Sequence, residues 1–334
     1  MKEKMLVSLD GGVESLVTAW LLKKQGFQLR GILFDVSHGA TDKDSLQLRV
    51  SEYEKKLGIP VQVMDCSDEA REIVFKEVEL CINRGFKYEI KSIFHQKFLI
   101  PKLFELKDQF QFQKISTGHR VSLHHEPLEN KMKVLRFHNP KEDDAQLLMG
   151  LTQEQLSSLL FPLGSIPIAM VLKLAAELDL KSDLEPMRFV LHNKTNHKNE
   201  PTNSVDVSNV GMSQDIGSLS VGEKFDQPIV FDFNSNINQI AGNHLVREIK
   251  EIWLENASWF SGDDLGFKIK SCLISWEAGL VSVPVQMIQF EGGGMKALLD
   301  QPLTGENANI FIGDIILCLE NDSVLGGARV IKCL

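Results

Sequence analysis

Two short segments of the sequence carry residue types suited to binding a phosphate group. Asp10-Gly11-Gly12-Val13-Glu14-Ser15 follows an apolar run and precedes a helical pattern, so it predicts a loop from a strand into a helix. Glycines let backbone N–H groups approach a phosphate closely, and the positive end of the helix dipole favours an anion. Ser116-Thr117-Gly118-His119 predicts a second turn with polar side chains. The alternative for the first segment is an ordinary tight turn.

The two carboxylates of the first segment complicate a phosphate site. A carboxylate at ~4 Å from a pyrophosphate costs up to ~4 kcal/mol at an effective dielectric constant near 20. Mg²⁺ could bridge Asp10 to the phosphates, or Asp10 could turn away and cap the first helix. Glu14 could hold a metal or simply complement the helix dipole. Both pairs of alternatives stay open.

The elements that must position these segments alternate between strands and helices. We expect strands at 5–9, Leu29–Phe34, Val61–Met64 and Lys114–Ser116, and helices at 13–25, 45–57, 68–83 and 90–106. This alternation predicts an α/β fold with a doubly wound parallel sheet. Ligands bind such sheets at the carboxyl ends of the strands. The Asp10 loop and the Ser116–His119 turn should therefore meet at one edge of the sheet.

The second half of the chain changes character. Helices are predicted at Thr152–Leu160, with Thr152 as N-cap, and at 167–178, before a polar stretch from His192 to Ser220. Short alternating runs follow and predict a β-barrel or sandwich: Pro228–Phe233, Glu248–Leu254, Lys268–Ser275, Val281–Phe290, Lys296–Leu299, Ile310–Leu319 and Val324–Ile331. We predict domains at 1–195, 196–264 (a shortened central region) and 265–334.

Composition narrows the cellular setting. The five cysteines are scattered without a C-x-x-C pair, which fits a reducing compartment and argues against disulfides or a zinc ribbon. No apolar run approaches the ~20 residues that span a bilayer, and no leader pattern is evident. We therefore expect a cytoplasmic protein without a membrane partner. The net charge of −9 argues against broad nonspecific nucleic-acid binding, although it permits a local basic groove.

Several motifs together resemble the tRNA-specific 2-thiouridylase (MnmA/TrmU) family of PP-loop ATP-pyrophosphatases. Ser116–His119 is similar to the family's Ala-Thr-Gly-His. Residues 151–156 (Leu-Thr-Gln-Glu-Gln-Leu) and 160–164 (Leu-Phe-Pro-Leu-Gly) match its most specific block, and 321–328 resemble the end of its C-terminal barrel.

The resemblance implies an activity and a set of contacts. It implies ATP with Mg²⁺, adenylation of the wobble uridine of tRNA, and sulfur delivery by a cysteine persulfide. The implied nucleotide contacts are Asp10, Gly11, Gly12, Val13, Glu14, Ser15, Phe34, Gly118 and His119.

The chain departs from the family where the chemistry is expected. The family loop reads Ser-Gly-Gly-x-Asp-Ser, whereas Asp10 and Glu14 stand here at the first serine and the aspartate. Its cysteine positions fall near Ile90 and Ile93 and at Arg188. Its Lys-Asp-Gln-Ser motif aligns with Glu142–Ala145, where only Asp143 is retained. These changes predict loss of persulfide sulfur transfer, so we expect neither a sulfur-relay partner nor an iron–sulfur cluster.

Other residues could replace the missing groups. Cys66 lies near the ligand edge and Cys81 on an apolar helix face, and for both we favour a structural role over a sulfur carrier. His124 and His125 are expected to be solvated in a loop, and His192 and His197 could form at most a weak metal cluster. Arg188 could make a salt bridge or bind an anion.

Two functions remain open from the sequence. The first is a divergent enzyme that still adenylates tRNA or another carbonyl group with an external nucleophile. The second is a pseudoenzyme that binds tRNA or protein on the same scaffold.

Overall fold

A computed structural model describes residues 2–180, apart from 38, 40, 85, 87, 138, 140 and 141, together with shorter segments beyond them. These segments are 188–191, 205–206, 229–232, 248–260, 271–276, 283–289, 294–304, 310, 312–321 and 323–334. The chain forms two compact units. Unit 1 comprises Met1–Leu80, Glu89–His119 and Ile166–Gln239, and unit 2 comprises Cys81–Tyr88, Arg120–Ser165 and Ile240–Leu334. The predicted domain boundaries at 195 and 264 lie outside the described residues.

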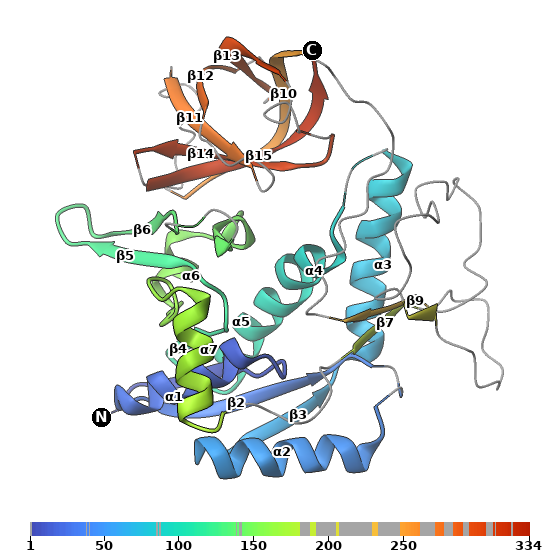
Figure 1. The fold of residues 1–334 in the computed structure, drawn as a ribbon, viewed down its shortest axis with the longest axis vertical. Coiled ribbons are helices and arrows are strands. Elements are labelled where there is room, and N and C mark those ends of the chain that lie inside the picture. Colours follow the sequence, from blue (N-terminus) through green and yellow to red (C-terminus); the bar gives the residue numbers. More distant parts are fainter. Residues whose placement is uncertain are drawn as a thin grey trace. The chain divides into compact units, whose positions relative to one another are not determined.

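Unit 1 is built on a parallel sheet in the order β3-β2-β1-β4, in which β2 and β3 lie side by side in Figure 1. The strands are β1 (Lys4–Ser8), β2 (Gln28–Asp35), β3 (Val61–Asp65) and β4 (Lys114–Ser116). The predicted α/β fold with a parallel sheet is confirmed. Strand order reverses between β1 and β4, and this topological switch brings together the loops that follow these two strands. β1 is buried because it pairs on both sides and reads as a continuous apolar run from Met5 to Val7.

The helices of unit 1 follow the predicted periodicity closely. They are α1 (Val13–Lys24), α2 (Lys43–Leu57), α3 (Ser67–Asn83), α4 (Ile90–Ile93), α5 (Ile100–Gln109) and α7 (Ile168–Glu177). Asp42 caps α2 through the N–H of Ser45, and α2 ends at Gly58 with a left-handed φ of 60°. Glycine suits that end because it adopts positive φ without steric cost.

The single helix predicted over 90–106 is instead three helical segments. A π-helix, η1 (Phe94–Leu99), separates α4 from α5. Pro101 lies in the first turn of α5. It has no N–H for the carbonyl four residues earlier and its ring clashes with that carbonyl, which favours a wider turn just before it.

A small sheet also lies within the sequence range of unit 1. It contains β7 (Arg188–Leu191), β9 (Ile229–Asp232) and β8 (Val205–Asp206) in the order β7-β9-β8. The strand β9 matches the run predicted at Pro228–Phe233.

Unit 2 is antiparallel, as the alternating runs predicted. Its C-terminal strands are β10 (Glu248–Trp259), β11 (Ser271–Trp276), β12 (Val283–Gln289), β13 (Met295–Thr304), β14 (Ile315–Glu320) and β15 (Ser323–Cys333). The ladder runs β10-β13-β12-β11-β14-β15, and β15 pairs again with β10. This second pairing closes the strands into a barrel around buried residues such as Ile252 and Val330.

A hairpin extends the sheet of unit 2. Its strands β5 (Ser122–Glu126) and β6 (Lys131–Leu135) join the barrel where β6 pairs with β15. The short helix α6 (Gln153–Ser157) and a 3₁₀ turn, η3 (Ala145–Leu148), complete the unit. Among the described residues, no helix is long and apolar enough to cross a membrane.

Candidate functional site

The loop after β1 is held together by its own carboxylate. Oδ1 of Asp10 accepts a hydrogen bond from the backbone N–H of Gly12 at 2.9 Å and lies 2.6 Å from the hydroxyl of Ser15. The N-cap of α1 is Gly12, so the suggestion that Asp10 caps this helix is wrong. Asp10 instead folds back over the loop, where Gly11 has a positive φ of 92°. The N–H of Gly12, which a bound phosphate would use, therefore already donates to the Asp10 carboxylate.

The turn after β4 packs directly against this loop. A Cβ atom added at Gly118 would lie 2.7 Å from the backbone nitrogen of Ser15 and 3.0 Å from the carbonyl carbon of Glu14. Only glycine permits this approach, because real Cβ contacts are not that short. The two segments singled out in the sequence thus meet at the carboxyl edge of the sheet.

His119 forms the centre of a hydrogen-bonded chain. Its Nδ1 lies 2.7 Å from Oγ1 of Thr117, and its Nε2 lies 3.1 Å from Nδ1 of His95. The two imidazoles meet edge to face with centroids 4.5 Å apart. His95 is buried, and burial, followed by the neighbouring charges of His119 and Lys91, holds its pKa well below the usual value. Both ring nitrogens of His119 thus already face protein partners.

The remaining predicted nucleotide contacts differ in character. Val13 and Glu14 form the half-buried first turn of α1. Phe34 is buried and packs edge to face on Phe98, with centroids 5.8 Å apart. Its role as a nucleotide contact stays a prediction.

Ile90, Ile93 and Arg188 are the positions predicted to align with the family's cysteines. Ile90 and Ile93 lie on α4 and are 7% and 8% exposed, so they contribute to the apolar core. Arg188 begins β7, and its backbone pairs with Asp232. Neither isoleucine can carry sulfur, because an alkyl side chain has no nucleophilic atom.

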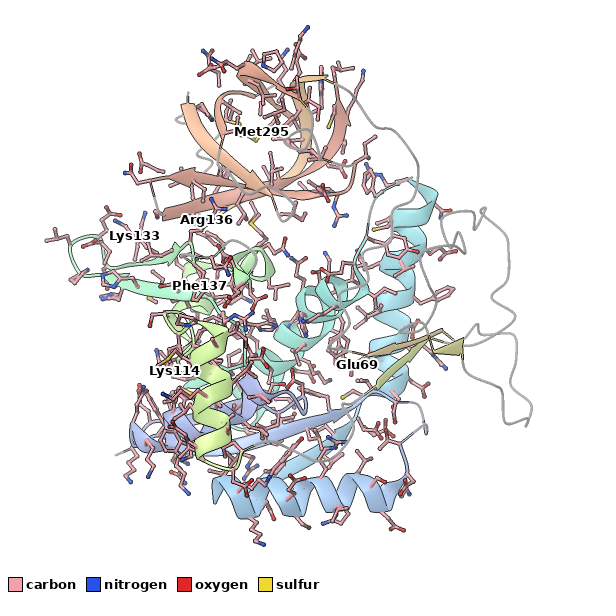
Figure 2. The ribbon with its side chains drawn as sticks, viewed as in Figure 1. Glu69, Lys114, Lys133, Arg136, Phe137 and Met295 are labelled. Carbon is pink, nitrogen blue, oxygen red and sulfur yellow. The ribbon has the colours of Figure 1, made fainter. Side chains whose placement is uncertain are left out.

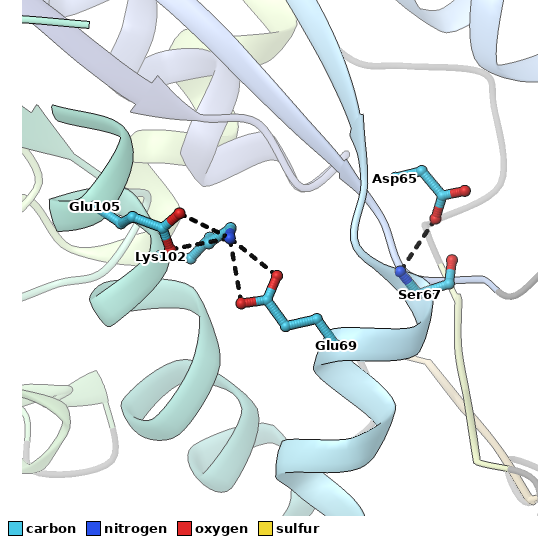
Figure 3. Close-up of polar contacts among 5 residues, drawn as sticks. All are labelled: Asp65, Ser67, Glu69, Lys102 and Glu105. Carbon is cyan, nitrogen blue, oxygen red and sulfur yellow. Dashed lines mark hydrogen bonds and ion pairs between the residues drawn. The ribbon is translucent and has the colours of Figure 1, made fainter. Parts of the chain in front are cut away.

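Cys66 follows β3 at the carboxyl edge but sits in an unfavourable electrostatic setting for a thiolate. Burial and the charge of Glu69 raise the pKa of Cys66 to about 11, whereas the charge of Lys102 lowers it. Lys102 is shared between two carboxylates, Glu69 and Glu105, each 2.9 Å from its Nζ (Figure 3). The thiol of Cys66 is therefore protonated near neutral pH, in keeping with a structural role.

Cys81, the second candidate carrier, is also buried. Its sulfur lies 3.7 Å from Nη1 of Arg329 within unit 2, and only 3% of the residue is exposed. This setting agrees with the predicted core thiol.

Residues 142–145, predicted to align with the family's Lys-Asp-Gln-Ser motif, stabilise a turn in unit 2. The Asp143 carboxylate accepts hydrogen bonds from the N–H groups of Phe137 at 3.2 Å and Ala145 at 2.9 Å. Burial raises the pKa of Asp143 to about 6, although these hydrogen bonds oppose the shift.

The neighbouring Glu142 forms an ion pair. Its carboxylate lies 3.5 Å from Nε of Arg120, whose backbone N–H donates to Asp144 at 2.9 Å. Glu142 thus has a cationic partner in Arg120.

Residues 151–164, which resemble the family's most specific motif, also stabilise unit 2. Thr152 and Gln155 form a capping box at the start of α6, which confirms the predicted N-cap. The side-chain amide of Gln153 bonds both the N–H and the C=O of Met132, at 2.7 and 3.0 Å, and so fixes β6. A Cβ at Gly164 would lie 2.1 Å from the carbonyl oxygen of Val121. Thr152, Gln153, Gln155 and Gly164 thus each contribute to the packing of unit 2.

The remaining histidines divide into two groups. His124 and His125 are exposed as expected, but they belong to strand β5 and not to a loop. The hairpin turn at Asn130, with a positive φ of 51°, allows the strands to pair. His192 and His197 lie outside the described residues. Within the described part of the chain, no group of His, Cys, Asp and Glu could hold a metal ion.

His95 is the residue of this edge that sequence reasoning missed. It lies in an apolar helical pattern whose spacing resembles an ordinary core face, and only the fold brings it to His119.

A parallel sheet with a glycine loop at its topological switch defines the class of doubly wound α/β domains. The family model described as the tRNA methyl transferase HUP domain matches residues 3–186. This chain belongs to that family.

Curated relatives carry the description tRNA-specific 2-thiouridylase MnmA. The protein of Leptothrix cholodnii is 27% identical over 54% of this chain and 48% of its own length. That of Polynucleobacter asymbioticus is 29% identical over 53% and 49%. In these matches the chain spans about half the length of the relative. The protein of Picosynechococcus is 23% identical over 98% of both chains.

A solved structure described as a predicted subunit of tRNA methyltransferase from Methanocaldococcus jannaschii covers 53% of this chain and 75% of its own chain. Its sequence identity is 19% and its TM-score 0.33. The structural similarity is too low to carry any inference.

Proposed function

We propose that this protein is a cytoplasmic tRNA-binding member of the thiouridylase family that does not transfer sulfur through its own cysteines and does not use its loop as an ATP site. The bond from the Gly12 N–H to the Asp10 carboxylate carries the second part of the proposal. Family membership supports tRNA as the bound molecule.

The proposed loss of sulfur transfer is supported by the residues near the family's cysteine positions and by the raised pKa values of the remaining thiols. Persulfide chemistry needs a thiolate nucleophile. The positions predicted to align with the family's cysteines fall near Ile90 and Ile93, which are buried, and burial raises the pKa of Cys66 at the carboxyl edge to about 11. Burial also raises the pKa of Cys333, in unit 2, to about 12. Both thiols are therefore poor nucleophiles near neutral pH.

The proposed loss of ATP binding is supported by the repulsion between the Asp10 carboxylate and a pyrophosphate. A pyrophosphate seated on the loop would meet the carboxylate of Asp10 at close range, which costs up to ~4 kcal/mol at ~4 Å and an effective dielectric constant near 20. It would also have to displace Asp10 from Gly12 and Ser15. The residues present therefore do not fit a nucleotide phosphate in the absence of a bridging cation.

The competing function is ATP-dependent adenylation of tRNA, which the family implies. It requires Mg²⁺ to bridge Asp10 to the phosphates. The two functions differ in a measurable way, because only adenylation needs the unmodified loop to bind Mg²⁺–ATP.

Calorimetric titration with ATP and MgCl₂ separates them. We expect no binding heat with the wild-type protein and micromolar binding with Asp10→Ser, which restores the family residue. Asp44→Ser removes another exposed acid, from the first turn of α2, and should not bind ATP. Tight Mg²⁺–ATP binding by the wild type, abolished by Asp10→Ser, would establish the adenylating alternative.

A second measurement tests the role in tRNA modification. Mass spectrometry of tRNA from a strain lacking this gene should show an unchanged wobble uridine, and filter binding should show direct tRNA binding by the protein. Loss of a thiolated wobble base in that strain would contradict the proposal.

A further inference from the structure

The charges of unit 1 are separated along the strand direction. The carboxyl edge of the sheet and the helix starts beside it carry Asp10, Glu14, Asp35, Asp42, Asp44, Asp65, Asp68 and Glu69. The amino edge and the helix ends beside it carry Lys4, Lys23, Lys24, Arg30, Lys55, Lys56, Lys107 and Lys114. Figure 2 shows one member of each set, Glu69 and Lys114, on opposite sides of unit 1.

The topology places these bases together. Lys4 begins β1 opposite Gln28, and Met5 pairs with Lys114 on the other side. Helices α1, α2 and α5 each end only a few residues before the next strand begins, so their last turns must lie at the edge where the strands start. Basic residues occupy the last turn of all three helices.

Helix dipoles explain only part of the pattern. They favour bases at helix ends and acids at helix starts. They do not account for Lys4, Arg30 and Lys114, which lie on strands, nor for Asp35 at the end of β2.

Four acids lie near the amino edge: Glu3, Glu52, Glu54 and Asp108. Glu52 lies 3.1 Å from Lys56, and Asp108 lies 2.8 Å from Lys107. The Glu54 carboxylate accepts the N–H of Val61 at 3.0 Å. The eight bases named above thus outnumber these four acids, and the edge keeps an excess of positive charge.

Aromatic rings flank two of these cations. The guanidinium of Arg30 lies 5.5 and 5.7 Å from the ring centroids of Phe110 and Phe112, and Nζ of Lys24 lies 5.3 Å from the ring of Trp20. Such contacts restrict a cation without neutralising its charge. A restricted, planar guanidinium is well suited to a phosphate group.

We propose that the amino edge of this sheet, through Lys4, Lys24 and Arg30, binds the phosphate backbone of RNA. The inference rests on the proposed tRNA binding and assigns it to the edge opposite the glycine loop. Phosphate neutralisation supplies most of the affinity of nonspecific RNA contacts, and the acidic carboxyl edge would repel the same backbone.

The test compares two sets of charge-neutralising substitutions. One variant combines Lys4→Gln, Lys24→Gln and Arg30→Gln. The control combines Lys43→Gln, Lys76→Gln and Lys97→Gln, three exposed lysines of the same unit away from this edge. Binding of a tRNA transcript is measured by filter binding from 50 to 300 mM KCl, and circular dichroism checks folding.

We expect the first variant to bind tRNA about tenfold more weakly at low salt, with a salt slope reduced by ~0.9 for each phosphate that the protein no longer neutralises. The control should keep the wild-type affinity and slope. Equal reductions in both variants, or none in the first, would overturn the assignment to this edge. If the first variant is unfolded, a double variant is used that combines Lys4→Gln and Lys24→Gln and keeps the half-buried Arg30. Its affinity for tRNA must be reduced as well, by a smaller factor.

The same titration separates failure of this inference from failure of the proposed function. A wild-type protein that binds no tRNA contradicts the proposed function itself. Wild-type binding that is insensitive to the amino-edge substitutions contradicts only the docking site. Binding of polyglutamate in place of tRNA would identify an acidic protein as the partner and also overturn the inference.

Discussion

Nε2 of His119 and Nδ1 of His95 lie 3.1 Å apart, so the turn after β4 is tied to the π-helix η1 by an imidazole pair. Only one of these two nitrogens can carry the shared hydrogen. Because His95 is buried, the pair favours a neutral His95, whose pKa is held well below its usual value by burial and by the charge of His119. The relationship makes the stability of this edge sensitive to pH.

We predict that the protein loses stability on mild acidification. The unfolded chain protonates His95 near pH 6.5, whereas the folded state does not, so the unfolded state binds more protons below that pH. The contribution of His95 to stability is therefore full above about pH 6.5 and decreases below it, by on the order of 1 kcal/mol between pH 7.5 and 5.5. Urea unfolding at both pH values measures the change. His95→Asn, which retains an acceptor near the Nδ1 position, should reduce it, whereas His125→Asn on the exposed hairpin should not.

We predict that Gly118→Ala destabilises unit 1. The new Cβ would lie 2.7 Å from the backbone nitrogen of Ser15, so the β4 turn and the loop must separate. The expected cost is about 1–3 kcal/mol, as for other overpacked sites. Gly12→Ala is the comparison, because its Cβ would meet a side-chain oxygen of Asp10 at 3.2 Å, which can move. Thermal melting should rank Gly118→Ala as the more harmful change, and the reverse order would contradict the close packing.

We predict that Gln153→Ala weakens the attachment of the β5–β6 hairpin. It removes the partners of both backbone groups of Met132, at an expected cost of about 2–4 kcal/mol if they stay buried. Gln155→Ala removes only half of the capping box and should cost about 1 kcal/mol. Hydrogen exchange at the Met132 amide reports the effect locally. Unchanged protection in Gln153→Ala would show that other contacts hold the strand.

We predict that Cys66 is a slow nucleophile. With a pKa of about 11, its thiolate fraction at pH 7.5 is far below that of an ordinary cysteine. Alkylation by iodoacetamide, followed by mass spectrometry from pH 7 to 11, should give a rate that still increases at the highest pH. Glu69→Gln removes the negative charge that most raises the pKa of Cys66 and should shift the dependence of the alkylation rate on pH to lower pH. A rate that levels off near pH 7 would restore Cys66 as a candidate sulfur carrier.

Local signals predicted the elements of the parallel sheet and the barrel well. Gly58 ends α2 and Thr152 caps α6 as predicted, since these positions depend on backbone conformation and nearby side chains. The hairpin β5–β6 was missed, because His124, His125 and Glu126 give it no apolar alternation. The π-helix was missed because its cause, Pro101, lies within an otherwise regular helical pattern.

The candidate site was predicted only in part. The glycines and the Thr-Gly-His turn lie where the strand order places them. The position of the Asp10 carboxylate, the pairing of His95 with His119 and the protonation of Cys66 could not be read from the sequence. Each depends on groups far apart in the chain and on the loss of solvent around them.

The sequence by itself determined the α/β fold and the family, because these follow from periodicity and motif order. Only the tertiary structure decided what the glycine loop holds. A carboxylate next to a loop can face solvent, a metal or the loop itself. In the folded chain Asp10 faces Gly12 and Ser15, since the helix start presents an N–H and a hydroxyl within hydrogen-bonding distance of it.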